Sequence, residues 1–476
     1  MITPILFTDF YKTDHRRQYP HGTTLVYSNL TPRTSRIDGV DAVVVFGIQY
    51  FIKDYLIRRF NEGFFKKDKK EVIAAYKRRT DNALGPDAFP LDHLEKLHDL
   101  GYLPIKIKVL PEGSLCPLRV PFLTIQNTKP EFFWITNFLE TIMCNVLWGA
   151  VNSATIAHQY RKILDEYADK TSDIPEFVQW QGHDFSMRGM FGLEASLISG
   201  MAHLISFTGT DTIPAIDALE NFYGANSEKE LIGGSVPATE HSVMCMGGKC
   251  DELATYRRLL TEVYPKGIVS IVSDTWDYWK VFSEIIPQLK NEIMQRDGKF
   301  VVRPDSGNPV EIICGTDNKK GSIELLWDIF GGTVNSKGYK QLDPHIGLIY
   351  GDSITIDICK QICSGLEEKR LASTNVVFGI GSYTYQYNTR DTLGFAMKST
   401  YGEIDGVGVE IFKDPITDSG VKKSAKGLLR VNSDLTLSEG VSRTEENKGL
   451  LETVFLDGVL IKDQKLSEIR KRLNES

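Results

Sequence analysis

The chain has 476 residues, of which 42% are apolar and 25% charged, the composition of an ordinary globular protein with a large core. A formal net charge of −7 excludes the broadly basic surface that holds nucleic acids or anionic membranes. No apolar stretch approaches the roughly 18 residues of a membrane span, and Asp9 comes too early for a signal peptide, so we expect a cytoplasmic protein.

The first 150 residues mix short strands and helices. The pattern predicts a helix at about 48–61, a Lys-rich helical segment at 66–79, and short strands interrupted by prolines at 102–125. This succession is typical of a small antiparallel sheet with helices beside it. Two apolar helices are expected next, within 131–161.

Residues 151–394 alternate between short apolar runs and helix-like stretches. Continuous Val and Ile runs of this kind predict parallel strands that are buried on both faces and joined by helical crossovers. In such folds the residues just past the carboxyl ends of the strands line the ligand site. We therefore expect one cavity to be faced by the residues that end these runs, namely Asp274, Arg303, Asp305, Asp352 and Gly381.

Beyond Lys398 the pattern returns to strands. Asp457-Gly458 predicts a tight turn between two of them, and a short helix is expected at 466–473. The predicted fold class is α/β. An irregular β/α barrel at 151–394 is flanked by an α+β domain of antiparallel strands, which residues 1–150 and 395–476 build together.

The common motifs of nucleotide-binding loops, dinucleotide folds, serine hydrolases and zinc proteases are absent from the chain. What remains is the set of Arg, Asp and Gly residues at strand ends. Asp274 and Asp352 could equally cap the helices that follow them. Arg303 and Asp305 are two positions apart on a strand and so point to the same side. Together they suit a substrate that carries anionic and hydroxyl groups.

Three upstream segments also carry candidate site residues. Phe185 and Arg188 precede an apolar helix at 193–205, where an Arg would add an anion clamp to the helix N-terminus. The alternative is a surface Arg with Phe185 in the core. Asp211 ends a strand-like run, and His241 follows a proline-containing loop with Glu240 adjoining. A lone His is more often structural than catalytic.

These residues lie in strings that resemble the nicotinamide phosphoribosyltransferase family. GHDFSMRG, GTDT, SVPATEHS, SIVSD, VVRPDSGNP, the GD at Gly351 and the TRD at Thr389 occur in the family's order, and TDFYKTDHRRQYP is similar to its N-terminal segment. The resemblance runs from about Thr8 to Lys426, nearly the whole chain. Prokaryotic and phage members look most similar, because Ser382 stands where the animal enzymes carry a glycine.

The resemblance implies a type II phosphoribosyltransferase fold. It also implies synthesis of nicotinamide mononucleotide and diphosphate from nicotinamide and 5-phosphoribosyl 1-diphosphate, with Mg²⁺. The enzyme would be a homodimer with its sites at the subunit boundary, contacted by the start of the chain. The family's positions map onto Arg188, Arg303 and His241 at the diphosphate, Asp305 and Asp352 at the ribose, Gly351, Gly381, Ser382 and Arg390 at the 5′-phosphate, and Ser270 and Asp274 elsewhere in the substrate site.

The resemblance also places the pyridine ring. Phe185 of one subunit and Tyr11 of the other would sandwich it, and Asp9 would arrive beside Tyr11. Asp211 would accept a hydrogen bond from the carboxamide of nicotinamide and repel the carboxylate of nicotinate. Nicotinamide specificity is therefore expected.

ATP hydrolysis is coupled to turnover in the family through a phosphohistidine, which maps onto His241. Glu240 is the expected partner of the other imidazole nitrogen. Lys398, Lys413, Lys422 and Lys423 resemble the contacts to the nucleotide phosphates, although a solvated Lys-rich loop would explain the last two. Two other functions stay open: a nicotinate phosphoribosyltransferase, and a binding protein that keeps the fold without activity.

Overall fold

The computed structural model describes residues 2–351, 354–413 and 424–475. Its contacts divide the chain into two compact units. Unit 1 comprises Met1–Thr155, Ala218–Ala225 and Asn388–Ser476, and unit 2 comprises Ile156–Asp217 and Asn226–Tyr387. Residues 151–155, 218–225 and 388–394, which the sequence pattern assigned to the central domain, thus group with unit 1.

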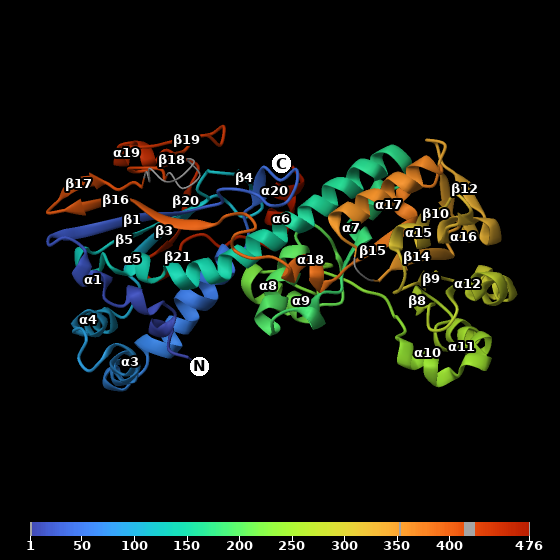
Figure 1. Ribbon diagram of the computed structural model, residues 1–476, viewed down its shortest axis with the longest axis horizontal. Helices are drawn as coiled ribbons and strands as arrows, with labels where there is room; N and C mark the ends of the chain where they lie inside the picture. Colours follow the sequence, from blue (N-terminus) through green and yellow to red (C-terminus); the bar gives the residue numbers. More distant parts are fainter. Residues whose placement is uncertain (1, 352–353, 414–423, 476) are drawn as a thin grey trace. The chain divides into compact units, whose positions relative to one another are not determined.

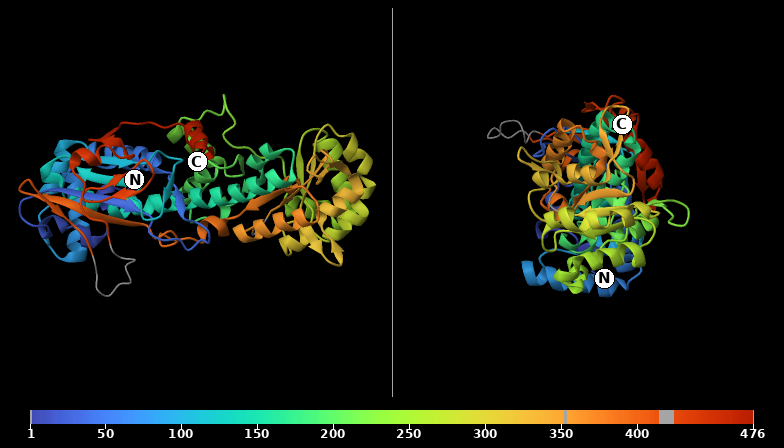
Figure 2. Two further views of the ribbon diagram at one scale, coloured as in Figure 1. Left: turned by 90° about the horizontal axis from the view of Figure 1, so that it is seen from above. Right: turned by 90° about the vertical axis from the view of Figure 1, so that its right-hand side faces the viewer.

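Unit 1 contains a seven-stranded antiparallel sheet with the order β17-β16-β1-β5-β3-β20-β21. A strand from the N-terminal part of the chain, β1 (Thr23–Thr31), pairs with β16 (Ala396–Ile404) from the C-terminal part, and the two lie side by side in Figures 1 and 2. The sequence prediction that both chain ends build one flanking sheet is confirmed. The strands are β1 Thr23–Thr31, β3 Ile105–Val109, β5 Leu123–Asn127, β16 Ala396–Ile404, β17 Val407–Glu410, β20 Glu452–Leu456 and β21 Val459–Leu460.

The predicted turn at Asp457-Gly458 joins β20 to β21. Both residues have positive φ, 48° and 84°, as a two-residue hairpin turn requires. Two short strand pairs complete the β structure of unit 1: β2 Ala42–Val44 with β4 Leu115–Pro117, and β18 Arg430–Val431 with β19 Leu437–Ser438.

Helices accompany the sheet of unit 1. They are α1 His15–Gln18, α2 Ile48–Phe51 with π-helical turns at Ile52–Arg59 and Asn61–Phe65, α3 Lys69–Leu84, α4 Asp92–Leu100, α5 Ile135–Phe138, α19 Arg443–Glu446 and α20 Leu466–Asn474. Two further helices, α6 Glu140–Thr171 and α9 Ile213–Tyr223, contribute residues to both units.

A buried carboxylate organises the start of α2. Glu112 accepts hydrogen bonds from the backbone N–H groups of Gly47 (2.9 Å) and Gln49 (2.6 Å) and from the hydroxyl of Tyr223 (2.9 Å). Gly47 has a φ of 91°, and a Cβ there would lie 2.4 Å from that of Ala150, so the position requires glycine. Burial raises the pKa of Glu112 to about 7 despite these donors.

Unit 2 is built on six parallel strands in the order β7-β6-β15-β14-β9-β8. They are β6 Gly182–Asp184, β7 Gly209–Thr210, β8 Val269–Val272, β9 Phe300–Arg303, β14 Ile346–Tyr350 and β15 Val376–Ile380. Every residue of β8 and β14 is buried, as expected of parallel strands covered on both faces.

An extended segment at residues 234–239 joins the two edges of this sheet. The N–H of Gly234 donates to Thr208 O (2.8 Å) beside β7, and the N–H of Thr239 donates to Ser270 O (3.0 Å) in β8. The parallel sheet therefore curls around and closes through an irregular seventh segment. The predicted α/β class with an irregular β/α barrel is confirmed.

The crossovers of unit 2 are helical, and in Figure 1 α15, α16 and α17 lie together beside the strands. Because the strands are parallel, their carboxyl ends meet at one end of the barrel. The helices are α7 Val178–Gln181, α8 Leu193–His203, α10 His241–Gly247, α11 Glu252–Arg258, α12 Tyr278–Lys280, α13 Ile286–Gln288, α14 Lys290–Gln295, α15 Pro309–Cys314, α16 Ser322–Phe330, α17 Ile356–Glu368 and α18 Ser382–Gln386.

Two small hairpins decorate unit 2: β10 Gly315–Thr316 with β11 Lys319–Lys320, and β12 Gly332–Val334 with β13 Lys340–Leu342. Within the described parts of the chain, no helix combines the length and apolar character needed to cross a membrane.

Candidate active site

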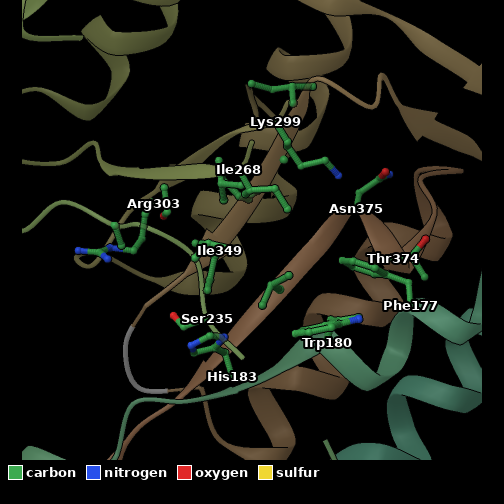
Figure 3. Close-up of a pocket in the computed structure, with 18 of the residues that line it drawn as sticks. Phe177, Trp180, His183, Ser235, Ile268, Lys299, Arg303, Ile349, Thr374 and Asn375 are labelled. Atoms are coloured by element: carbon green, nitrogen blue, oxygen red, sulfur yellow. The ribbon is translucent and has the colours of Figure 1, made fainter. Parts of the chain in front are cut away.

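A cavity of about 530 Å³ runs along the inside of the barrel, and unit 2 supplies its whole lining (Figure 3). Alternate strand residues face it, because side chains along a strand point to opposite sides. Packed barrels fill their interior with layers of bulky side chains. Here Gly234, Ala238 and Ser270 are among the lining residues, and such small side chains leave the interior open.

At the carboxyl end of the barrel the carboxylate of Asp211 follows β7. Its Oδ1 lies 2.9 Å from His183 Nε2 and accepts a hydrogen bond from Ser235 Oγ at 2.5 Å. Burial alone would raise the pKa of this carboxyl. The hydrogen bonds from His183 and Ser235 and the charge of Arg303 have a larger opposite effect, so the pKa lies below its ordinary value. Asp211 is therefore ionised at neutral pH.

Phe185 follows β6 and lines the same cavity as Asp211. Its N–H donates to Ile380 O (2.9 Å) in the neighbouring strand. A Cβ on Gly379 would lie 2.8 Å from the Phe185 ring, so a glycine is required where the ring rests on the backbone. The ring centroid lies 4.6 Å from that of His183. His183 thus contacts both the aromatic and the acidic side chain at this end of the cavity.

Arg303 and Asp305 lie together at the end of β9, as their spacing predicted. Arg303 Nε lies 3.5 Å from Asp305 Oδ1, and Arg303 Nη2 donates to Thr239 O at 2.6 Å. Gly351, at the end of β14, is in close contact with them, since a Cβ there would lie 2.1 Å from Asp305 Oδ1. The structure therefore brings three of the predicted residues into one cluster.

Asp274 connects this cluster to His241. Its Oδ1 lies 3.3 Å from His241 Nε2, while its Oδ2 accepts hydrogen bonds from the N–H of Asp305 (3.2 Å) and from Ser306 Oγ. The alternative that Asp274 caps the next helix is wrong. That cap is Asp277, which accepts the N–H groups at the start of α12.

The expected pairing of His241 with Glu240 is also wrong. The carboxylate of Glu240 accepts a hydrogen bond from Ser242 Oγ. Glu240 has extended backbone angles just before α10, so its side chain leaves the chain in a different direction from that of His241. The partner of the imidazole is instead Asp274, whose side chain is only 5% exposed.

Arg188 lies in the 3₁₀ turn Met187–Gly189 and is exposed. This turn packs tightly on the start of α18, because a Cβ on Gly189 would lie 2.0 Å from Ser382 Oγ. Gly381 precedes α18 and has nothing within 4 Å of where a Cβ would stand. The structure therefore places Arg188 and Ser382 in contacting segments.

The remaining predicted residues belong to unit 1 or to segments that are not described. Asp9 accepts a hydrogen bond from Thr141 Oγ1 (2.7 Å), and Tyr11 is 62% exposed with its ring edge-on to His15. Arg390 forms an ion pair with Asp391 (3.4 Å), Lys398 is exposed on β16, and the N–H of Lys413 donates to Ser424 Oγ. Asp352, Lys422 and Lys423 lie outside the described residues.

Sequence reasoning did not single out His183 or Ser235. His183 lies within the string GHDFSMRG and Ser235 within SVPATEHS, but neither string shows that both side chains converge on Asp211. Ser270 was singled out, and its hydroxyl lies in the cavity lining, buried and without a hydrogen-bonding partner among the described residues. An open polar group of this kind is available to a ligand.

At the carboxyl end of a parallel barrel, where ligands bind, an Arg–Asp cluster can hold anionic and hydroxyl groups, and an aromatic ring with an ionised carboxylate can hold a flat ring that donates a hydrogen bond. Residues 180–459, more than half of the chain, match the model of the nicotinate phosphoribosyltransferase (NAPRTase) family. The chain belongs to this family. Residues 4–107 also match the N-terminal domain model of nicotinamide phosphoribosyltransferase.

Curated relatives cover nearly the same length. The nicotinamide phosphoribosyltransferase of Acinetobacter baylyi is 54% identical over 99% of this chain and 97% of its own. The enzyme of the same name from Mycoplasma pneumoniae is 34% identical over 87% of this chain and 92% of its own. The family resemblance drawn from the motifs is therefore confirmed.

Two solved structures share the fold. Nicotinate-nucleotide pyrophosphorylase from Pyrococcus furiosus aligns with a TM-score of 0.58 and 14% identity, over 98% of this chain and 93% of its own. Human nicotinic acid phosphoribosyltransferase aligns with a TM-score of 0.56 and 15% identity, over 99% and 93%. At this identity the likeness concerns the fold, and the type II phosphoribosyltransferase architecture is confirmed.

Proposed function

We propose that the chain transfers the phosphoribosyl group of 5-phosphoribosyl 1-diphosphate to nicotinamide, forming nicotinamide mononucleotide and diphosphate. The observation that carries the proposal is that the ionised Asp211 and the aromatic Phe185 line one cavity at the carboxyl end of the barrel. A carboxylate accepts the amide N–H of nicotinamide and repels the carboxylate of nicotinate. The A. baylyi relative that is 54% identical bears the name of the nicotinamide enzyme.

The Arg303 cluster supports the sugar and leaving-group end of the reaction. The transfer breaks the bond between C1 of the ribose and the diphosphate oxygen, and forms a bond from C1 to the pyridine nitrogen. Positive charge develops on the ribose as negative charge builds on the diphosphate. Arg303 would bind the diphosphate and Asp305 the ribose hydroxyls, with Arg188 as a second cation. Gly351, Gly381 and Ser382 would contact the 5′-phosphate.

Magnesium fits these residues. No cluster of three or more His, Cys, Asp or Glu that could hold a metal occurs in the described parts of the chain. Mg²⁺ commonly binds through one or two carboxylates together with substrate phosphates rather than in a protein cage. Asp305 is the carboxylate that would hold it, and the ion would neutralise charge on the departing diphosphate.

Coupling to ATP would proceed through His241. Because Asp274 lies beside Nε2, we place the proton on Nε2 and the nucleophilic lone pair on Nδ1. Nδ1 would attack the γ-phosphorus of ATP, so that the new bond is Nδ1–P and ADP leaves. Lys398, Lys413 and Lys422 would bind the nucleotide phosphates. The enzyme would act as a homodimer in which the exposed Tyr11, with Asp9, reaches the site of the partner subunit.

One assay tests the function. Protein, Mg²⁺ and 5-phosphoribosyl 1-diphosphate are mixed with nicotinamide or with nicotinate, with and without ATP, and the mononucleotide is measured. We expect nicotinamide to be converted and nicotinate to react poorly, with ATP raising the yield. Equal or preferential use of nicotinate would contradict the role of Asp211.

A further inference from the structure

Asp184 is a fully buried carboxylate in the barrel wall, and the proposed reaction leaves it without a role. It ends β6 between His183 and Phe185, which both line the cavity, and Figure 3 shows His183 there. Because successive side chains along a strand point to opposite sides, the side chain of Asp184 points away from the cavity. It therefore acts on a ligand in the cavity only through other residues.

One oxygen of this carboxylate fixes the chain around Phe185. Oδ1 of Asp184 accepts a hydrogen bond from the N–H of Ser186 at 2.9 Å, and Ser186 is also fully buried. The hydrogen bond closes a short turn whose central residue is Phe185. The direction in which the aromatic ring leaves the chain thus depends on the carboxylate of Asp184.

The other oxygen holds both neighbours of Asp211. Oδ2 of Asp184 accepts the hydroxyl of Thr212 at 2.7 Å and, in a longer contact, that of Thr210 at 3.5 Å. Thr210 Oγ1 in turn accepts the N–H of Thr212 at 3.0 Å, and the N–H of Asp211 donates to the backbone oxygen of Asp184 at 3.0 Å. Asp211 is therefore the middle residue of a segment that is tied to Asp184 at every position.

The neighbouring imidazole of His203 does not supply a counter-charge. Its Nε2 lies 3.2 Å from Gly182 O and 3.0 Å from Gly209 O, and since carbonyl oxygens only accept, Nε2 carries the proton. Its Nδ1 lies 2.7 Å from the hydroxyl of Tyr385 and accepts from it, and burial lowers the pKa of His203. The buried carboxylate of Asp184 thus depends on its N–H and O–H donors.

We propose that Asp184 is a positioning residue for nicotinamide, which fixes Phe185 and Asp211 relative to each other from the outer side of the barrel wall. The role assumes the nicotinamide transfer proposed above. A carboxylate suits it, because each oxygen accepts donors from a different segment, whereas an amide accepts on one side only. Loss of a donor should loosen the pyridine site and leave the Arg303 cluster unchanged.

Two substitutions of Thr212 separate the hydrogen bond from packing. Thr212→Val keeps the shape of the side chain and removes the hydroxyl, whereas Thr212→Ser keeps the hydroxyl and removes the methyl group. That methyl group packs on α8, because a Cβ on Gly200 would lie 3.1 Å from Thr212 Cγ2. Thr212→Val should raise the KM for nicotinamide roughly tenfold without changing the KM for 5-phosphoribosyl 1-diphosphate. Thr212→Ser should stay within about twofold of the wild type for both substrates.

Asp184→Asn tests the carboxylate itself. It removes one acceptor and should raise the KM for nicotinamide roughly tenfold. The double variant Asp184→Asn/Thr212→Val should be no worse than either single variant, since both remove the same contact. The matched control is Thr171→Val, because Thr171 is fully buried in the same unit, donates to Tyr167 O at 2.7 Å and lies outside the cavity lining. It should lose stability as Thr212→Val does but keep the wild-type KM values.

The kinetic pattern decides between positioning and general packing. An equal rise of KM in Thr212→Ser, a rise of both KM values together, or an unchanged KM in Thr212→Val would each overturn the proposal. Hydrogen–deuterium exchange without substrate is the second measurement. The amides of residues 185–187 and 210–213 should exchange faster in Thr212→Val than in the wild type or Thr171→Val.

The exchange measurement also separates this inference from the proposed function. A wild-type protein that forms no nicotinamide mononucleotide would contradict the function. Exchange would then still show whether Asp184 holds the two segments, because it involves no turnover. Unchanged exchange in both Thr212→Val and Asp184→Asn would overturn the positioning role even if the wild type were active.

Discussion

Replacing Asp211 by Asn removes one charge from the proposed pyridine site while preserving its shape. The amide oxygen of Asn can still accept the hydrogen bonds that His183 and Ser235 give to Asp211 Oδ1. The substitution therefore isolates the electrostatic contribution to substrate choice. We expect the variant to fold as the wild type does and to lose its discrimination against nicotinate.

The size of the effect follows from the geometry. Two like charges about 4 Å apart repel by about 1 kcal/mol in water and about 4 kcal/mol at an effective dielectric constant of about 20. Because the Asp211 side chain is 45% exposed, solvent screening reduces the upper figure. A penalty of about 2.4 kcal/mol for nicotinate corresponds to roughly 50-fold. Nicotinamide should lose about 1 kcal/mol when its acceptor becomes neutral, roughly fivefold.

The ratio of kcat/KM for nicotinamide to that for nicotinate should therefore fall by roughly two hundredfold in Asp211→Asn. The assay measures both mononucleotides at saturating 5-phosphoribosyl 1-diphosphate. Asp328→Asn is the matched control, since Asp328 forms an ion pair with Lys320 on the surface of the same unit. An unchanged ratio in Asp211→Asn would refute the electrostatic explanation of specificity.

Three further predictions concern other residues. His183→Gln should raise the KM for nicotinamide roughly tenfold with a smaller effect on kcat, because both Asp211 and Phe185 lose a contact; a change confined to kcat would argue against a positioning role. His241→Ala should abolish ATP hydrolysis and leave weak, ATP-independent transfer, and Asp274→Asn should reduce hydrolysis more than Glu240→Gln; persistent ATP stimulation in His241→Ala would contradict the phosphohistidine. Glu112 has a folded-state pKa of about 7, above its ordinary value of 4.5, so its protonated form favours folding and that contribution is lost as pH rises through 7. Between pH 5 and pH 8 the wild type should lose up to about 3 kcal/mol of its free energy of unfolding. Glu112→Gln loses a hydrogen-bond acceptor and should be less stable overall, but its melting temperature should fall less over the same pH range. Parallel profiles of melting temperature against pH would contradict the buried ionisation.

Much of the fold could be read from local patterns. The Val and Ile runs that end at Asp274 and Arg303 predicted buried parallel strands, and Asp457-Gly458 predicted a hairpin turn, because each pattern reflects the backbone preferences of neighbouring residues. The pairing of β1 with β16 is different, since their residues are hundreds of positions apart. The shared sheet was inferred from strand-like patterns at both ends of the chain, on either side of the β/α region, and no local pattern specified that β1 pairs with β16.

In the candidate site, too, contacts between residues close in sequence were predictable and contacts between distant residues were not. The proximity of Arg303 and Asp305 was predicted from their separation of two positions, although Asp305 lies just beyond the end of β9 rather than on the strand. The partner of His241 was not predictable in this way. The adjacent Glu240 was expected, but Asp274, which is 33 positions away, occupies that place. The convergence of His183 and Ser235 on Asp211 likewise depends on three separate strands and loops meeting at one end of the barrel.

The sequence alone therefore determined the type and order of the elements, the strand ends that carry charge, and the family. Tertiary structure decided which charged groups contact one another and that the barrel interior is open from Asp211 to Lys299. The physical reason is the separation along the chain over which each kind of interaction acts. Secondary structure follows from interactions within a few residues, whereas ionisation, hydrogen-bond partners and cavities depend on how distant segments pack and exclude water.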